Sequence, residues 1–226
     1  MNEMSFLTPL LISGKLALCT TVILFIIGMP IAYAFSFSHF RFRSMCEALV
    51  CMPMVLPPTV MGFYILITYN PRNWFGHFLE QYFDLRLAFS FPGILIASII
   101  CSLPFMIQPL QNGLSALPAS YREAAYTMGK GPIATFFSVL LPNIKGSIIT
   151  AIAMTFAHCM GEFGVVLMVG GNMPGITRVA SIAIYDEVQD MNYTLANKYA
   201  LILFVVSFFI LVVIYGINNV TKNKIK

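Results

Sequence analysis

Five long apolar stretches constrain this chain more than any other feature of its sequence. They cover residues 7–37, 45–69, 91–113, 144–170 and 199–220. Each reaches the length of about 20 residues at which an α-helix crosses the hydrocarbon layer, where unpaired backbone groups are too costly to tolerate. A composition of 58% apolar and 10% charged residues excludes an ordinary soluble globule. We therefore predict an all-α integral membrane protein of about five transmembrane helices, with residues 1–226 forming a single transmembrane domain whose core is 7–220.

The basic residues are distributed unevenly between the two sides of such a protein. Lys and Arg favour cytoplasmic loops. The side that carries the C-terminus holds most of these residues. The other side holds fewer, and Lys15 lies near the outer end of the first span. The richer side carries Arg41, Arg43, Arg122, Lys130, Lys145, Lys222, Lys224 and Lys226, and the poorer side carries Arg72, Arg86, Arg178 and Lys198. We expect the N-terminus outside and the C-terminus in the cytoplasm.

Two simpler features narrow the class further. The start, Met1-Asn2-Glu3-Met4, has no basic region before the first apolar stretch, so no cleaved signal peptide is expected. The five cysteines are scattered through or beside the apolar stretches without a Cys-x-x-Cys pair. We interpret them as small hydrophobic residues rather than disulfides or metal ligands, and we predict no metal site.

A partly charged loop, residues 114–143, interrupts the membrane pattern. It reads Glu-Ala-Ala, three residues, Gly129, and then Leu-Pro twelve residues later. Gly129 is expected to end a first short helix and to let a second, over 132–140, leave at an angle. Ser120 is a candidate N-cap with Glu123 as its capping-box partner, which would give Glu123 a structural role. This interruption predicts a surface that docks against a soluble partner. The alternative is an ordinary interfacial helix.

Prolines interrupt the second apolar stretch. Pro53, Pro57 and Pro58 stand within six residues, and Thr59 follows. Non-helical backbone at membrane depth persists only inside protein or beside a water-filled cavity, so the run predicts a broken segment in the core, at the pathway. Its alternative is a cytoplasmic turn before a helix that starts at Thr59. Residues 70–90 are expected to form an external loop with interfacial aromatic side chains.

The fourth apolar stretch contains two titratable residues, His158 and Glu162, at helical spacing i and i+4. An isolated charge at mid-membrane costs about 2.5 to 3.5 kcal/mol on insertion scales, so Glu162 should face protein or water and have a partner, for which His158 is the nearest candidate. A carboxylate would repel an anion, so we favour a gate or helix-locking role, beside a purely structural one. Gly161 and Gly164 are expected to allow close helix contact.

The segment after the fourth stretch, 170–175, is too rich in turn-forming residues to be helical. It is expected to form the outer loop over a pore, with backbone N–H groups free to meet an oxyanion or a docked protein. Lys15 has two interpretations, attraction of anions to the outer mouth or snorkelling to the interface. There is no Walker motif, so any ATP must be hydrolysed by another polypeptide.

These motifs together resemble a known family. The loop with Glu123-Ala124-Ala125 and Gly129 resembles the cytoplasmic coupling loop of ABC importer permeases. Nearly the whole chain resembles the membrane subunit of molybdate ABC importers. The resemblance is carried by the run 56–64, the Gly-Glu-Phe-Gly run at 161–164 and the Gly-Gly-Asn-x-Pro-Gly run at 170–175. Sulfate, thiosulfate and tungstate permeases look similar in these runs. The resemblance implies a type I ABC importer transmembrane domain in the bacterial cytoplasmic (inner) membrane.

The resemblance also implies partners and residue roles. It implies a homodimer, two cytoplasmic ABC ATPase subunits that use ATP, an extracytoplasmic substrate-binding protein, molybdate and membrane lipid, with no cofactor bound by this chain and no nucleic acid. The ATPase-coupling residues would be Glu123, Ala124, Ala125, Gly129, Leu141 and Pro142. The pathway or gate residues would be Pro57, Pro58, Thr59, His158, Gly161, Glu162, Gly164, Gly170, Gly171 and Asn172.

Two other classes were weighed. A proton-coupled carrier would use His158 and Glu162 as a relay, but such carriers usually contain internal repeats and none is visible in the sequence. A membrane-bound enzyme has little support because no nucleophile with a base and no metal cluster is apparent. ATP-dependence of uptake without a proton gradient separates the first class from an ATP-driven importer.

Overall fold

The computed structural model describes residues 3–38 and 41–223, and the regular elements within these ranges are all helices. The prediction of an all-α protein is confirmed. In chain order the elements are α1 (Glu3–Phe37), α2 (Arg43–Val55), α3 (Pro58–Tyr69), α4 (Trp74–Phe83), α5 (Phe91–Ser115), α6 (Ala119–Thr127), α7 (Pro132–Thr135), the π-helical turn η1 (Phe136–Leu140), α8 (Leu141–Asn143), α9 (Lys145–Gly161), α10 (Gly164–Gly170), α11 (Ala180–Gln189) and α12 (Tyr193–Asn223).

Three of these helices are long and apolar enough to cross a membrane by themselves, in the ranges Phe6–Phe37, Phe91–Ser115 and Tyr193–Val213. Two bent pairs raise the number of spans in the described residues to as many as five. In the first pair, α2 and α3 meet at 112°, and in the second, the segment Pro132–Asn143 meets α9 at 77°. The described residues thus hold three to five candidate spans, and the expected five is reached when each bent pair is counted as one span.

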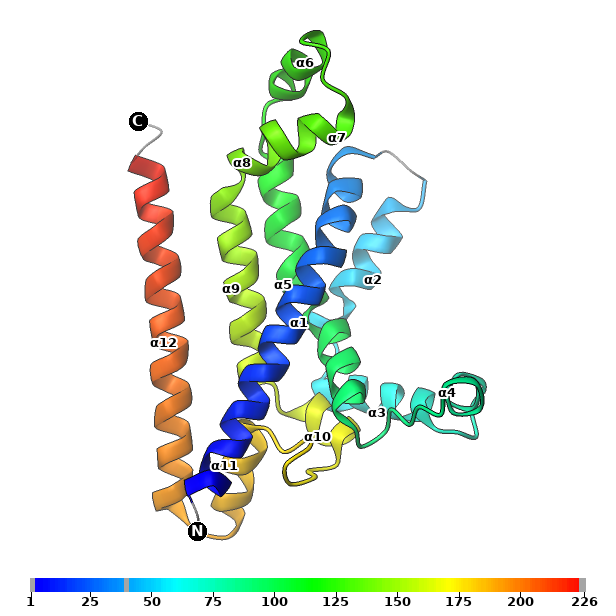
Figure 1. Ribbon diagram of the computed structural model, residues 1–226, viewed down its shortest axis with the longest axis vertical. Coiled ribbons are helices and arrows are strands. Elements are labelled where there is room, and N and C mark those ends of the chain that lie inside the picture. The colour runs from blue at the N-terminus through cyan, green and yellow to red at the C-terminus, as the bar shows by residue number, and fades with distance from the viewer. Residues whose placement is uncertain (1–2, 39–40, 224–226) are drawn as a thin grey trace.

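The core is a bundle of α1, α5 and α9 (Figure 1). One buried apolar cluster lies toward the end that carries α6 to α8, and a second lies toward the opposite end, where α3 and α10 join the bundle. Helix α1 runs through Pro9 and Pro30 without a break, and α5 runs through Pro104 and Pro109. Helix α12 stands at the side, contacts α9 and α11, and exposes most of its apolar side chains, as expected of a lipid-facing helix.

The two ends of the bundle differ in what they carry (Figure 1). Helices α6 to α8 project from one end, where α12 also finishes, whereas α4, α10, α11 and the start of α1 lie at the other. Lys224 and Lys226, which contribute to the predicted charge asymmetry, lie outside the described residues. The expectation of a plain loop over 70–90 was wrong in part, because it contains the ten-residue helix α4, whose Trp74 and Tyr82 are exposed.

Candidate functional site

A cavity of about 580 Å³ lies where two helix breaks meet at the middle of the bundle. One break separates α2 from α3, the other separates α9 from α10, and α5 forms the wall between them. The breaks are in contact, because a Cβ on Gly164 would lie 3.0 Å from Cβ of Pro58. The lining residues are Pro53, Pro58, Thr59, Met61, Cys101, Ala157, His158, Gly161, Glu162, Phe163, Gly164 and Val165.

The proline break has a local cause. Pro57 is the N-cap of α3 in extended backbone, at φ −55° and ψ 135°, and Pro58 occupies the first helical position, where its missing N–H costs nothing. Because a residue before proline is driven out of the α region, the chain cannot continue α2 through Leu56 into α3. The predicted broken segment is confirmed. A turn followed by a helix from Thr59 is wrong, because helix precedes the break as well and α3 starts at Pro58.

Glu162 is the buried charged group of this cavity. It caps the C-terminus of α9 in extended backbone, at φ −66° and ψ 126°, and its side chain is 7% exposed. Its Oε2 accepts a hydrogen bond of 2.5 Å from Oγ of Ser98 on α5, while its Oε1 has no partner. Its backbone carbonyl accepts a hydrogen bond of 2.7 Å from Ser181 on α11. The break in the fourth span is thus tied to two other helices.

His158 is not the partner of Glu162, so that prediction was wrong. Helix α9 ends at Gly161, and the i to i+4 relation fails at the residue where the backbone leaves the helix. The imidazole instead stacks on the ring of Phe105, with centroids 4.1 Å apart and planes at 21°. His158 and Glu162 both line the cavity, but the Glu162 carboxylate accepts its hydrogen bond from Ser98 on α5 rather than from a residue of α9.

The two glycines beside Glu162 have different environments. A Cβ on Gly164 would press on Pro58, which confirms close contact there, whereas a Cβ on Gly161 would meet nothing within 4 Å, so close contact at Gly161 was wrongly predicted. Gly161 instead faces the open cavity.

We expect Gly164→Leu to lower the free energy of unfolding by about 1 to 3 kcal/mol, because it overpacks the contact between the two breaks. Gly161→Leu should leave unfolding nearly unchanged, because its side chain enters open space, and should lower transport by narrowing the cavity. Unfolding of the two variants in micelles, followed by circular dichroism, measures the difference. Equal destabilisation by both would contradict the assigned contact.

The loop after α10 is held in place by polar contacts. Gly171 and Asn172 have positive φ, at 64° and 57°, and follow the end of α10, so the predicted non-helical segment is confirmed from Gly171 on and was wrong for Gly170, which is helical. Asn172 donates a 2.9 Å hydrogen bond to Asp186, which also forms a 2.7 Å ion pair with Arg178. Of the predicted pathway residues, Pro58, Thr59, His158, Gly161, Glu162 and Gly164 line the cavity between the breaks, whereas Pro57, Gly170, Gly171 and Asn172 do not.

Two further sequence predictions concern Lys15 and the five cysteines. Nζ of Lys15 lies 4.6 Å from the centroid of the Phe91 ring, a cation–π contact that neither of its two interpretations included. All five cysteines are free.

Helices α6, α7, η1 and α8 form a compact projection, which we call the coupling unit, residues 119–143. Gly129, at φ 76°, ends α6, and the N–H groups of Gly129 and Lys130 bond to the carbonyls of Tyr126 and Ala125. This Schellman arrangement turns the chain into the second segment, which extends to Asn143 rather than stopping at 140. The predicted pair of angled helices is confirmed.

Other details of the coupling unit differ from prediction. Helix α6 starts at Ala119 with Pro118 as its N-cap and no side-chain capping bond, so Ser120 is not the cap. Ala125 is buried within the chain, and Glu123 and Ala124 are exposed, so of the alanine pair only Ala124 faces outward. Leu141 is half-buried and Pro142 is exposed. Large apolar side chains are exposed here as well: Tyr121, Tyr126, Met128, Ile133 and Phe137.

The coupling unit is continuous with both walls of the cavity. Helix α5 carries Ser98 beside Glu162 and runs into the unit, and α9 leaves the unit and ends at the cavity. The two helices pack closely beside the unit, where a Cβ on Gly113 would lie 2.3 Å from Oγ of Ser147. A displacement of the unit therefore moves α5 and α9 together.

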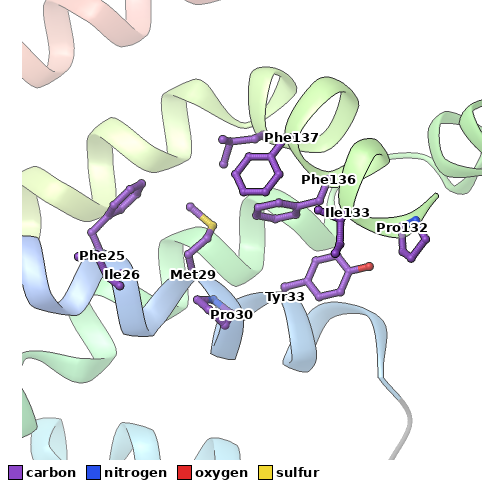
Figure 2. A pocket seen from close by; sticks show the side chains of 10 residues that line it. Phe25, Ile26, Met29, Pro30, Tyr33, Pro132, Ile133, Phe136 and Phe137 are labelled. Carbon is purple, nitrogen blue, oxygen red and sulfur yellow. The ribbon is translucent and has the colours of Figure 1, made fainter. Parts of the chain in front are cut away.

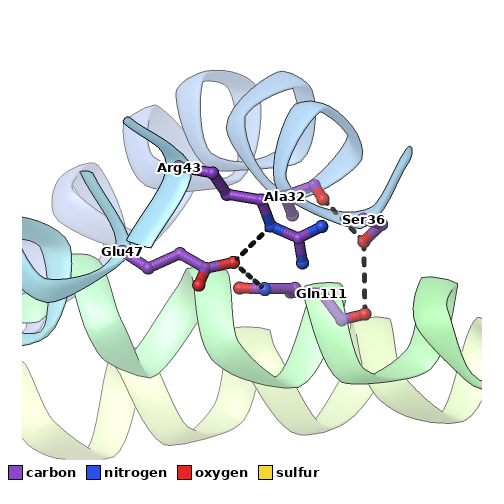
Figure 3. Close-up of polar contacts among 5 residues, drawn as sticks. All are labelled: Ala32, Ser36, Arg43, Glu47 and Gln111. Carbon is purple, nitrogen blue, oxygen red and sulfur yellow. Dashed lines mark hydrogen bonds and ion pairs between the residues drawn. The ribbon is translucent and has the colours of Figure 1, made fainter. Parts of the chain in front are cut away.

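A polar cluster near the coupling unit was missed by the sequence reasoning (Figure 3). Oε1 of Glu47 on α2 accepts hydrogen bonds from Arg43 at 2.9 Å and from Gln111 on α5 at 2.7 Å. Ser36 on α1 donates to the backbone carbonyls of Ala32 and Gln111. The spacing of Arg43 and Glu47 is a recognisable ion-pair signal in the sequence. Nothing in the sequence pointed to Gln111 or, at the cavity, to Ser98.

With this geometry in place, comparison with known proteins identifies the class. The family model described as "Binding-protein-dependent transport system inner membrane component" matches residues 24–223. The chain belongs to this family.

Among its relatives, this inner membrane component is 43% identical over 203 residues to the molybdenum transport system permease protein ModB of Azotobacter vinelandii, covering 89% of each chain. It is 30% identical over 194 residues to the sulfate transport system permease protein CysT of Salmonella typhimurium, covering 86% of this chain and 69% of that one.

The fold has a solved counterpart. An inward-facing conformation of the MetNI methionine ABC transporter matches with a TM-score of 0.72 and 15% sequence identity, over 97% of this chain and 99% of that chain. At this identity the match concerns the fold, and it agrees with the predicted type I ABC importer transmembrane domain.

Proposed function

We propose that this chain is the permease subunit of an ATP-driven importer of molybdate in the bacterial inner membrane. The observation that carries the proposal is that α5 and α9 connect an exposed coupling unit to a cavity at two helix breaks, in a chain 43% identical to a molybdenum permease. Sulfate is the second candidate substrate, because a sulfate permease is 30% identical; thiosulfate and tungstate are further alternatives by resemblance.

The proposed assembly contains two copies of this chain, two cytoplasmic ATPase subunits that bind and hydrolyse ATP, and an extracytoplasmic binding protein that delivers the anion. Support for a second copy comes from α3, beside the cavity, which exposes Phe63 and Tyr64 by 49% and 61%. A two-fold pair would cover this face and place the pathway on the symmetry axis. Glu123 and the exposed side chains of Tyr121, Tyr126 and Met128, on and directly after α6, are the surface offered to the ATPase.

The proposed orientation places the coupling unit and the C-terminus in the cytoplasm and the N-terminus outside. Arg43, Arg122, Lys130 and Lys145 lie at the coupling-unit end of the bundle, in line with the preference of basic residues for cytoplasmic loops. The opposite end, with α4, α11 and the loop 171–178, is then the face on which the binding protein docks.

The proposed cycle follows from the links between elements. ATP-driven closure of the two ATPase subunits pushes the coupling units together and shifts α5 and α9, which carry Ser98 and Glu162. The break regions then move apart toward the outside and receive the anion, and reopening after hydrolysis reverses the movement. Because a carboxylate repels a dianion, Glu162 acts in this scheme by fixing the break after α9 to α5 and α11 rather than by binding the substrate.

Uptake into vesicles tests the class and the substrate together. With the partner subunits, binding protein and internal ATP present, we expect molybdate accumulation that persists when the proton gradient is collapsed. Accumulation that requires the gradient would favour the proton-coupled carrier. Competition by excess tungstate and excess sulfate then ranks the anions, and stronger competition by sulfate than by unlabelled molybdate would assign the chain to sulfate.

A further inference from the structure

An apolar groove of about 550 Å³ lies between α1 and the second half of the coupling unit, away from the cavity at the helix breaks (Figure 2). Its side chains meet from opposite sides, as Met29 and Tyr33 of α1 face Phe136 and Phe137 of η1 in Figure 2. The lining residues are Phe25, Ile26, Met29, Pro30, Tyr33, Pro132, Ile133, Phe136, Phe137 and Leu141. Apart from the hydroxyl of Tyr33, these side chains are apolar.

The groove lies along α1, toward its coupling-unit end. Residues 25 to 33 cover about 12 Å of helix at about 1.5 Å per residue. They lie in the last turns of the apolar span Phe6–Phe37, so the groove extends from the hydrocarbon to the interface. Tyr33 stands at its interfacial end, the depth that tyrosine prefers.

Two cations stand next to that interfacial end. The guanidinium of Arg122 lies 4.6 Å from the centroid of the Phe37 ring, and Phe37 contacts Tyr33 with centroids 5.0 Å apart. Nζ of Lys130 donates a 2.9 Å hydrogen bond to Ser138, the neighbour of Phe137. Within the described residues, neither Arg122 nor Lys130 forms an ion pair with a carboxylate. The groove is thus apolar along its length and positively charged at one end.

We propose that this groove binds an anionic phospholipid, with one acyl chain between α1 and η1 and the headgroup phosphate at Arg122 and Lys130. An unfilled space of this size would forfeit dispersion contacts along its walls, so a chain is needed to fill it. Moving that chain from the bilayer into the groove brings no hydrophobic gain, because lipid tails are equally apolar. Selectivity therefore rests with the headgroup, and two cations near the surface favour an anionic lipid about thirtyfold.

The test places a tryptophan in the groove. In a Trp74→Phe background, which removes the chain's single tryptophan, Phe137→Trp reports lipid contact through quenching by brominated acyl chains. Vesicles of equal parts phosphatidylglycerol and phosphatidylcholine carry bromine on one lipid or the other. Ile133→Trp, at a position 74% exposed, provides a second reporter, and Phe204→Trp on α12, 67% exposed, provides a matched control on the lipid-facing side of the bundle.

We expect quenching at Phe137→Trp with about thirtyfold preference for phosphatidylglycerol, lost in Arg122→Gln/Lys130→Gln, and no preference at Phe204→Trp. Equal quenching by both lipids at the groove and at the control position would overturn the proposal. So would protection of both groove reporters from either lipid, which would mean that a protein, such as a second copy of this chain, covers the groove. The lipid proposal rests on the cytoplasmic placement of the coupling unit in the proposed function. The quenching measurement involves no transport, so its outcome is independent of the uptake assay.

Discussion

Glu123→Ala is expected to lower ATP-driven anion uptake by about tenfold or more while the chain remains folded in the membrane. Glu123 lies on α6, is exposed, and forms no hydrogen bond or ion pair with the residues that the structure describes. Because the capping bond expected of it is absent, its removal takes nothing from the stability of the helix. Its carboxylate is available to a partner, and losing one side of a desolvated charge pair at an interface costs several kcal/mol.

The measurement compares uptake with stability in the same vesicles. Ser44→Ala provides the control, because Ser44 is exposed on α2, outside both the coupling unit and the proposed binding-protein face. We expect the control to transport normally and both variants to unfold at the parent temperature. Normal uptake by Glu123→Ala would remove the docking role from this residue. Loss of uptake together with loss of folded protein would assign the residue to stability instead.

Ser98→Ala is expected to lower the free energy of unfolding by about 2 kcal/mol, the second large effect. The hydroxyl of Ser98 supplies the hydrogen bond that Glu162 accepts, and the other carboxylate oxygen already lacks a partner. Without that bond the carboxylate is buried with neither oxygen satisfied, which is more costly than losing a bond at the surface. Removing the carboxylate as well, in Ser98→Ala/Glu162→Leu, should recover most of the loss.

Ser102→Ala is the control for this cycle, because Ser102 lies one turn further along α5, is equally buried, and faces the Sγ of Cys159 at 3.1 Å rather than a carboxylate. We expect its cost to stay below about 1 kcal/mol. Unfolding in micelles gives the interaction energy between the two positions. If the changes in free energy of unfolding of the single variants add up to that of the double variant, the carboxylate does not depend on Ser98. Uptake by the double variant then tells whether Glu162 locks the break or also contributes to the pathway.

Backbone features of this protein were predictable because their causes are local. The span lengths follow from runs of apolar residues, and the break before α3 follows from Pro57-Pro58. The turn between α6 and α7 follows from Gly129, which adopts a φ of 76° that other residues rarely accept. Each depends on a few neighbouring residues, so these features were readable before any packing was known, whereas the break between α9 and α10 was not.

The failures concern side chains and helix ends that depend on distant residues. Glu162 was paired with His158 by helical spacing, yet the helix stops one residue earlier and Ser98, 64 residues away in sequence, takes the role. Gly161 and Gly164 look equivalent in the sequence, but one faces a cavity and the other touches Pro58. Ala125 is adjacent to Ala124 and has a similar side chain, yet it is buried.

The sequence by itself determined that the chain crosses a membrane, that a break precedes α3, and which loop projects, because apolar length, proline and glycine act on the backbone within a few residues. Only the tertiary structure decided that two of the interruptions meet around one cavity, that Ser98 holds Glu162 there, and that α1 and η1 enclose an apolar groove. These contacts join segments far apart in the chain, and their partners are selected by how whole helices pack.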